Sequence, residues 1–230
     1  MTSSARRWAL VAGAGAALAY LALLGQAPRP ALAALKPLPV LALAVWAWPP
    51  APATWPARWL PLALVVSAAG DLLLALDAFL AGVAVFLAAH VLYIAAFLQG
   101  TRRLRPWRAL PFLLWGAATF ALLAPVLGRL LVPVAVYMVA VCAMMWRAAA
   151  LAGDRAAPGA RGGWALAGAV LFGASDTLLA LHRFHTPWPD APYLVMLLYW
   201  AGQAALARSA RPASGISAGF QYHHAGPPAA

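Results

Sequence analysis

The sequence predicts an all-α, polytopic membrane protein with about eight transmembrane helices in two parallel four-helix repeats. Three observations support this class. Hydrophobic residues make up 65% of the 230 residues and charged residues only 9%, whereas a soluble domain has about a quarter charged residues. The apolar residues fall into runs long enough to cross a bilayer as helices. Two short segments, each with an aspartate at the same place, recur 105 residues apart.

The apolar runs give the expected spans in chain order. A spanning helix needs about 20 largely apolar residues, and inside lipid the backbone must satisfy its own hydrogen bonds, so helices are expected and not strands. The runs are residues 8–25, 31–48, 59–76, 79–99, 107–126, 130–150, 164–181 and 192–208. Turn-forming and polar residues separate them, for example in 26–30, 49–56, 101–105 and 153–163.

The first half of the chain, about 1–99, carries the first four spans. Arg6 and Arg7 precede the first span, whose apolar run is long for a signal peptide. Cleavage near residues 31–33, which resemble a signal-peptidase site, is the alternative. The third and fourth spans are joined only by a short link around Asp77.

The second half, about 107–208, carries the last four spans. Cys142 is the single cysteine and lies in an apolar run, so neither an internal disulfide nor a cysteine metal site is expected. Alanine, glycine, serine and proline dominate residues 209–230, a composition typical of disordered segments. We therefore expect one transmembrane domain over residues 1–208, followed by a disordered cytoplasmic tail.

The arginines predict an orientation, because cytoplasmic loops of membrane proteins carry most of the positive charge. With the N-terminus inside, twelve arginines fall on the inner side: Arg6, Arg7, Arg58, Arg102, Arg103, Arg105, Arg108, Arg147, Arg155, Arg161, Arg208 and Arg211. Only three fall on the outer side: Arg29, Arg129 and Arg183. This asymmetry predicts a multi-pass protein of the cell inner (plasma) membrane with both termini cytoplasmic. Because the net charge of +11 is spread over such loops, nucleic-acid binding is not expected.

The internal match carries the two aspartates that lie within spans. Gly70-Asp71 aligns with Ser175-Asp176, and Phe79 aligns with Phe184. Charged residues are rare in this chain, so the aligned aspartates weigh more than the aligned leucines around them. They lie in the third and seventh spans, which point the same way, and this predicts two four-helix halves related by an axis along the membrane normal.

Asp71 and Asp176 lie at a common depth in the apolar layer. Each is six residues before the first residue past the outer end of its span (77 and 182), roughly 9 Å below the boundary. A charge inside a membrane costs roughly 2.5–3.5 kcal/mol, so the aspartates are expected to face a shared polar cavity between the halves. The other polar residues expected near this layer are Lys36, His90, Tyr93, Tyr137, Tyr199 and Gln203. The alternative is an ion pair of Lys36 with an aspartate that only fixes helix packing.

These residues form a pattern that resembles the YhhN-type lysoplasmalogenase family of eight-helix membrane proteins. The resemblance runs from about Leu35 to Ala207. It rests on Lys36-Pro37, Gly70-Asp71-x-x-Leu74, Phe79-x-x-Gly82-x-x-x-Phe86-x-x-x-His90-x-x-Tyr93, Ser175-Asp176-x-x-Leu179-Ala180 with Phe184, and Tyr199-x-x-x-Gln203. It implies hydrolysis of the vinyl ether bond of lysoplasmalogens, which releases a fatty aldehyde and a glycerophospho-head group.

The chemistry of that reaction suits the two aspartates. Protonation of a vinyl ether carbon gives an oxocarbenium ion that water attacks, and glycosidases use paired carboxyl groups against a similar cation. We expect Asp71 and Asp176 to be the acid–base pair, with Lys36 keeping one of them ionised. We expect the other polar residues of the layer to position water and a lysophospholipid substrate: His90, Tyr93, Tyr137, Tyr199 and Gln203. No cofactor or metal is expected, and the oligomeric state is not predicted.

Two other classes of function use the same residues. A proton-coupled transporter, or a lipid-binding protein, can have a polar cavity near the midplane between repeats. Against this class, the eight spans lack obvious helices broken by glycine or proline in both halves, although Pro37 and Pro39 interrupt the second span. A structural scaffold predicts that the aspartates are dispensable.

Overall fold

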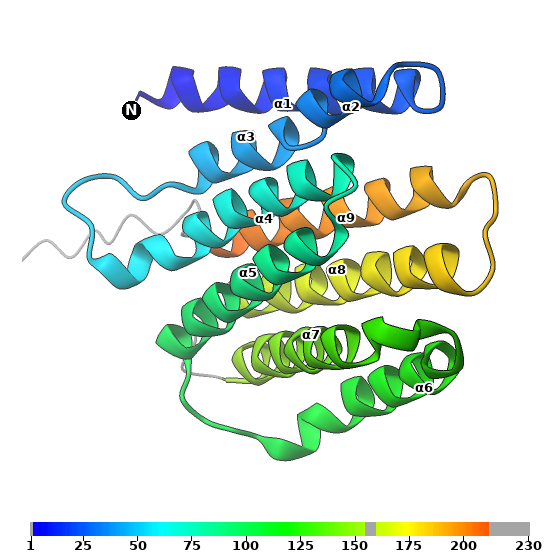
Figure 1. Cartoon of the computed structure of the whole chain (residues 1–230). Helices are drawn as coiled ribbons and strands as arrows, with labels where there is room; N and C mark the ends of the chain where they lie inside the picture. The colour runs from blue at the N-terminus through cyan, green and yellow to red at the C-terminus, as the bar shows by residue number, and fades with distance from the viewer. Residues whose placement is uncertain (1, 155–159, 212–230) are drawn as a thin grey trace, which may run out of the picture.

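The described residues form helices joined by loops, as the sequence predicts. The computed structural model describes residues 2–154 and 160–211 (Figure 1), and within these ranges it contains no strand. The α-helices are α1 (Ser3–Leu23), α2 (Arg29–Leu35), α3 (Leu38–Ala47), α4 (Trp59–Ala75), α5 (Phe79–Gly100), α6 (Leu110–Leu127), α7 (Leu131–Ala152), α8 (Ala160–Phe184) and α9 (Ala191–Ser209). The short 3-10 helices η1 (Trp55–Arg58), η2 (Pro106–Ala109) and η3 (Gly128–Leu130) precede α4, α6 and α7. Most of the predicted disordered tail, from residue 212 on, lies outside the described residues.

Each expected apolar run coincides with helical structure, and the second run is divided. In place of one helix over 31–48, α2 and α3 cover residues 29–35 and 38–47, with the break at Lys36 and Pro37. Lys36 and Pro37 keep helical dihedral angles, and the break arises because Pro37 and Pro39 have no N–H to donate to the preceding turn. The break loses little backbone bonding, because Lys36 N–H donates to Leu32 O and Leu41 N–H donates to Pro37 O.

Several helices have the length and hydropathy of membrane spans. Four segments of the described residues qualify: Arg29–Ala47, Phe79–Gly100, Pro106–Ala152 and Arg161–Phe184. The third of these is 47 residues long and contains both α6 and α7, which is enough for two crossings of about 20 residues each. α4 is apolar but shorter. The chain is therefore an all-α protein with several candidate membrane spans.

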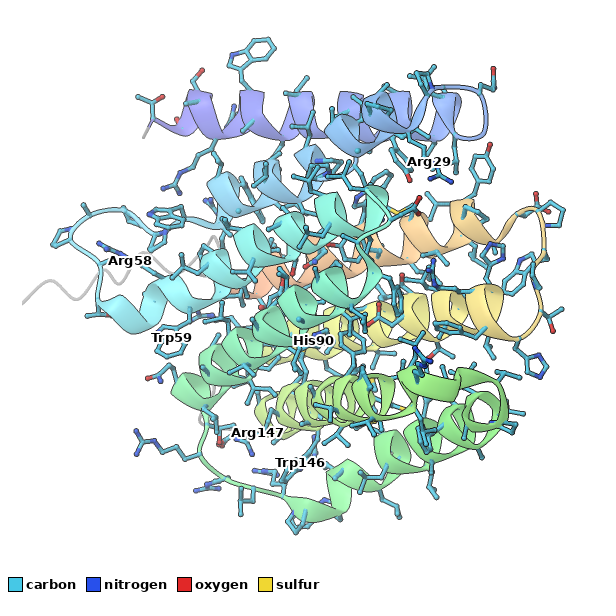
Figure 2. The ribbon with its side chains drawn as sticks, in the orientation of Figure 1. Arg29, Arg58, Trp59, His90, Trp146 and Arg147 are labelled. Atoms are coloured by element: carbon cyan, nitrogen blue, oxygen red, sulfur yellow. The ribbon has the colours of Figure 1, made fainter. Side chains whose placement is uncertain are left out.

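The helices lie side by side in a layered bundle, with α1 at one edge and α6 at the opposite edge (Figure 1). Packed pairs include α1 on α3, α3 on α4, α4 on α5, α6 on α7, α7 on α8, and α8 on α9. α5 also packs on α7, and α3 packs on α9. Arg58 and Arg147 lie toward one end of the bundle and Arg29 toward the other, with His90 between them (Figure 2).

Glycines let α8 and α9 approach closely beside the aspartate of α8. A Cβ atom on Gly202 would lie 3.0 Å from the Gly168 carbonyl oxygen and from the Phe172 amide nitrogen. Such backbone contact between helices needs residues without side chains. The same helix pair is joined by a hydrogen bond from Ser175 Oγ to the Val195 carbonyl at 2.9 Å. This tight seam fixes the position of α8 relative to the polar residues of α9.

The outer faces of several helices expose large apolar side chains. Exposed examples are Trp8, Val11 and Leu18 on α1, Leu110, Leu113 and Leu114 on α6, and Val132, Val136 and Val139 on α7. Soluble proteins rarely expose apolar patches that extend over several turns. These faces fit contact with the hydrocarbon of a membrane.

Candidate active site

A pocket between the helices of both halves contains the two aspartates of the internal match. Asp71 of α4 and Asp176 of α8 both line it, together with side chains of α5, α6, α7 and α9. The wall is otherwise mainly apolar, as at Phe86, Met138 and Leu179. The two aspartates therefore share a cavity, as expected, but its wall is mainly apolar, whereas the sequence predicts a polar one. The apolar wall has the character of a site for hydrocarbon.

Asp71 is buried and has two polar partners from other helices. Its side chain is 3% exposed. Tyr199 of α9 donates its hydroxyl to Asp71 Oδ2 at 2.8 Å. Lys36, at the break between α2 and α3, places its Nζ 3.7 Å from Asp71 Oδ1 and is itself 14% exposed. The carboxyl group is thus held by a phenol and balanced by an ammonium group.

Asp176 has a different environment. Tyr137 of α7 donates its hydroxyl to Asp176 Oδ2 at 2.7 Å. Among the described residues, no cation lies within ion-pair distance of Asp176. Asp176 is half-buried and lines the same pocket as Asp71. The pocket thus holds two carboxyl groups with unequal partners.

Three other polar residues of the predicted layer form a buried network beside the pocket. Tyr93 donates to Gln203 Oε1 at 2.6 Å, and Ser67 Oγ lies 3.4 Å from the Tyr93 hydroxyl. His90 is fully buried, with Nδ1 2.6 Å from the Phe86 carbonyl oxygen. The Nε2 atoms of His90 and Gln203 have no hydrogen-bond partner among the described residues.

Aromatic rings connect this network to the pocket. The His90 ring packs edge to face on Tyr137, with 5.1 Å between centroids. Phe172 packs in the same way on His90, Tyr93 and Tyr199. Of the predicted substrate-binding residues, Lys36, Tyr137 and Tyr199 therefore line the pocket with the aspartates. His90, Tyr93 and Gln203 lie behind its wall (Figure 2 shows His90 in the middle of the bundle).

The structure adds pocket residues that sequence reasoning did not select. Thr119 and Thr177 place hydroxyl groups in the wall, and Thr177 accepts a hydrogen bond from Trp115 Nε1 at 3.1 Å. Arg183, expected in an outer loop, lies in the last turn of α8 and also lines the pocket. Its position could have been read from spacing, because it follows Asp176 by seven residues and so lies on the same helix face.

Comparisons with known proteins all point to the same family of proteins. The model of the YhhN family matches residues 31–210. The lysoplasmalogenase TMEM86B of Homo sapiens is 37% identical over 180 residues, covering 77% of this chain and 74% of the relative. A lysoplasmalogenase of Mycobacterium tuberculosis is 36% identical over 138 residues, covering 55% of this chain and 50% of the relative. The lysoplasmalogenase TMEM86A of Bos taurus is 36% identical over 155 residues, covering 64% and 62%. No solved structure matches the chain.

Proposed function

Because this chain belongs to the YhhN family, we propose that it is a membrane hydrolase that cleaves the vinyl ether bond of lysoplasmalogen-like lysolipids. The products are a fatty aldehyde and a glycerophospho-head group. Relatives named lysoplasmalogenase support the reaction. The observation that carries the proposal is the placement of two carboxyl groups, Asp71 and Asp176, in one pocket with an apolar wall.

The membrane arrangement that goes with this function has eight spans in two repeats. The helix pairs support the repeat, because α1–α3, α3–α4 and α4–α5 have counterparts in α6–α7, α7–α8 and α8–α9. Between the halves, α5 on α7 has its counterpart in α9 on α3. In this arrangement both termini are cytoplasmic and the pocket opens toward the outer half of the membrane.

Side chains at equivalent places also support the repeat. One partner of each aspartate comes from the second span of its own half, Lys36 for Asp71 and Tyr137 for Asp176. The aligned aromatic residues Phe79 and Phe184 pack edge to face, with centroids 5.6 Å apart. Contact between equivalent residues is expected close to an axis that relates two halves.

The first chemical step is protonation of carbon, and we assign it to Asp176. The carbon of the vinyl group that is not bound to oxygen accepts the proton, and the positive charge develops on the ether carbon and oxygen. Lys36 balances the charge of an ionised Asp71, whereas Asp176 has no such counter-charge among the described residues. Two carboxyl groups in one low-dielectric site favour a state with a single shared negative charge. The protonated group is therefore placed at Asp176.

The second step is attack of water on the oxocarbenium carbon, and we assign activation of that water to Asp71. Its carboxylate also stabilises the cation that precedes the attack. The water loses a proton to a carboxylate, and the resulting hemiacetal collapses to the aldehyde as the glycerol oxygen takes up a proton. Tyr199 and Tyr137 hold the two carboxyl groups in position through their hydroxyl groups. We assign two buried Nε2 atoms to order water behind the pocket wall. That of Gln203 is a donor, and that of His90 is an acceptor in the neutral ring, whose Nδ1 donates to the Phe86 carbonyl.

Purified protein in detergent tests the reaction directly. We expect it to release fatty aldehyde from a lysoplasmalogen, but not from the analogue whose ether chain is saturated, because only the vinyl group accepts a proton on carbon. In D₂O, with the aldehyde reduced to alcohol as it forms, the product should carry one deuterium on the carbon next to the former carbonyl. Absence of aldehyde would overturn the proposal. Movement of lipid across liposomes without any product would favour a transporter.

A further inference from the structure

Arg183 is a cation of the pocket that the reaction above does not use. It lies in the last turn of α8, and its guanidinium carbon is 4.4 Å from the centroid of Phe79 and 5.8 Å from that of Phe184. Phe79 is the first residue of α5, so the contact joins the ends of two helices. An arginine stacked on an aromatic face keeps its N–H groups free at the edge of the plane.

No protein group neutralises this guanidinium among the described residues. Other cations nearby are paired: Lys36 contacts Asp71, and Arg29 contacts Asp77. Arg183 has neither a carboxylate within ion-pair distance nor a hydrogen-bond acceptor in the described chain. Its side chain is exposed and still forms part of the pocket lining. An unpaired guanidinium fixed at a pocket favours an anionic ligand.

The spacing from the reacting group to this cation fits one particular anion. Asp176 and Arg183 are seven residues apart on α8, which places them on one face and about 10.5 Å apart along the axis. In a lysoplasmalogen, seven bonds separate the vinyl carbon that takes the proton from the phosphorus atom. Such a chain spans at most about 8.5 Å, taking three backbone bonds to span about 3.6 Å. The reach of the two side chains can accommodate the difference.

We propose that Arg183, held by Phe79 and Phe184, binds the phosphate of the lysolipid head group. The identity of the lipid rests on the proposed function. The planar guanidinium offers two parallel N–H groups to phosphate oxygens, a geometry that lysine cannot provide. With the phosphate bound at the mouth, the glycerol backbone extends inward and places the vinyl ether between Asp71 and Asp176. Arg183 thereby sets which bond of the lipid meets the carboxyl groups.

Paired substrates with and without phosphate test this assignment. Steady-state cleavage would be measured for a lysoplasmalogen and for the matching alkenylglycerol, using the wild type, R183Q, R183K and the control R129Q. Arg129 is an exposed arginine that does not line the pocket. We expect R183Q to raise KM for the lysoplasmalogen by about 10-fold or more and to leave the alkenylglycerol kinetics unchanged. R183K should fall between wild type and R183Q, and R129Q should match wild type.

Equal losses of R183Q on both substrates would overturn the assignment, because a phosphate contact cannot affect a lipid that lacks phosphate. A thermal midpoint of each variant in detergent identifies a loss due to misfolding. If R183Q is misfolded, R183K decides instead, and equal kinetics of R183K and wild type on the lysoplasmalogen would contradict a bidentate phosphate contact.

A binding measurement separates this proposal from the reaction. Quenching of tryptophan fluorescence would follow titration with a saturated alkyl lysophospholipid, which is not a substrate, and with the corresponding alkylglycerol. Weaker binding of only the phospholipid to R183Q supports the site even if wild type releases no aldehyde, in which case only the proposed function fails. Unchanged binding of the phospholipid to R183Q overturns the site. Displacement of the phospholipid by inorganic phosphate would show a free-phosphate site and contradict the lipid assignment.

Discussion

At the scale of single residues, the two aspartates differ by one contact. Lys36 pairs with Asp71, while Asp176 has a tyrosine and no cation among the described residues. Charged residues inside a membrane are costly and are usually paired or functional. Lys36 accounts for the charge of one carboxylate, so a purely structural ion pair leaves Asp176 in the pocket without a role. The acid–base assignment gives each group a separate task.

The Lys36–Asp71 pair predicts a coupling in stability. Lys36→Met leaves the Asp71 carboxylate buried without a counter-charge, and breaking a buried pair from one side costs about 3–5 kcal/mol. The double variant K36M/D71N removes both charges, so we expect it to be more stable than K36M alone. Thermal or denaturant unfolding in detergent measures the four members of the cycle.

The exposed pair Arg29–Asp77 is a suitable control for that cycle, because both side chains are mostly exposed. Surface ion pairs contribute little to the free energy of unfolding, so R29M should hardly change the stability of the protein. If K36M and K36M/D71N were equally stable, the pairing would be contradicted.

At the scale of helices, the sequence predicts the positions of the spans well and the details of the pocket less well. A helix that crosses a membrane must present apolar side chains to hydrocarbon over its whole length. The apolar runs therefore predict the positions of helices, and α4 to α9 lie where these runs occur. The depth of a residue follows from the rise of 1.5 Å per residue along its helix. This estimate predicts that Asp71, Asp176, Tyr137 and Tyr199 lie near one layer, and in the structure all four line one pocket.

Helix face alone does not show how deep the pocket reaches. His90 and Tyr93 follow the pocket residue Phe86 by four and seven residues on the same face of α5, so they lie about 6 and 10.5 Å deeper. There they face a buried network beside Phe172 and not the cavity. The hydropathy pattern predicts a helix end at residue 181 and a loop position for Arg183, whereas α8 continues to Phe184. Neighbouring helices decide both features, and a single sequence does not show where they meet.

The close contact between α8 and α9 predicts that the glycines of these helices differ sharply in how well they tolerate replacement by alanine. Gly202→Ala would bring a Cβ within 3.0 Å of backbone atoms of α8, so the helices must separate and Tyr199 must shift relative to Asp71. Overpacking of this kind costs about 1–3 kcal/mol. We expect a lower thermal midpoint and lower aldehyde release.

Gly163→Ala in α8 is the matched control, because a Cβ atom at Gly163 would meet no neighbouring atom of the described residues within 4 Å outside the backbone of its own helix. Alanine favours a helix over glycine, so G163A should be as stable as wild type or more stable. Equal behaviour of G202A and G163A would show that the seam does not constrain the fold.

At the scale of the whole molecule, arginines gather where α3 and α9 end and α8 begins. Arg211 donates to the Trp46 carbonyl at 2.8 Å, and Arg161 donates to the Ser209 carbonyl at 3.0 Å, so these three helix ends meet. We propose that this end is cytoplasmic, because cytoplasmic loops of membrane proteins carry most of the positive charge. In that orientation the pocket, with Arg183 at the other end of α8, opens toward the outer side.

Cysteine labelling tests this orientation. Cys142 is buried and can be replaced by alanine, after which R129C and R102C each introduce a single exposed cysteine at opposite ends. In intact cells, a membrane-impermeant maleimide should label R129C and not R102C, while permeabilised cells should show both. The reverse pattern would invert the membrane orientation, and labelling of both in intact cells would contradict separation by a membrane.

The central claim, that two carboxyl groups in one membrane pocket carry out the hydrolysis, is tested most directly by aldehyde release from D71N and D176N. Asparagine keeps the size of each side chain but neither donates a carboxylic proton nor acts as a base. General acid–base groups contribute about 10²- to 10⁴-fold to rate, so each variant should lose at least about 100-fold in kcat. D176N should keep a thermal midpoint close to wild type, whereas D71N should have a lower one because Lys36 loses its counter-charge. A folded D71N or D176N that releases aldehyde at nearly the wild-type rate would contradict the claim.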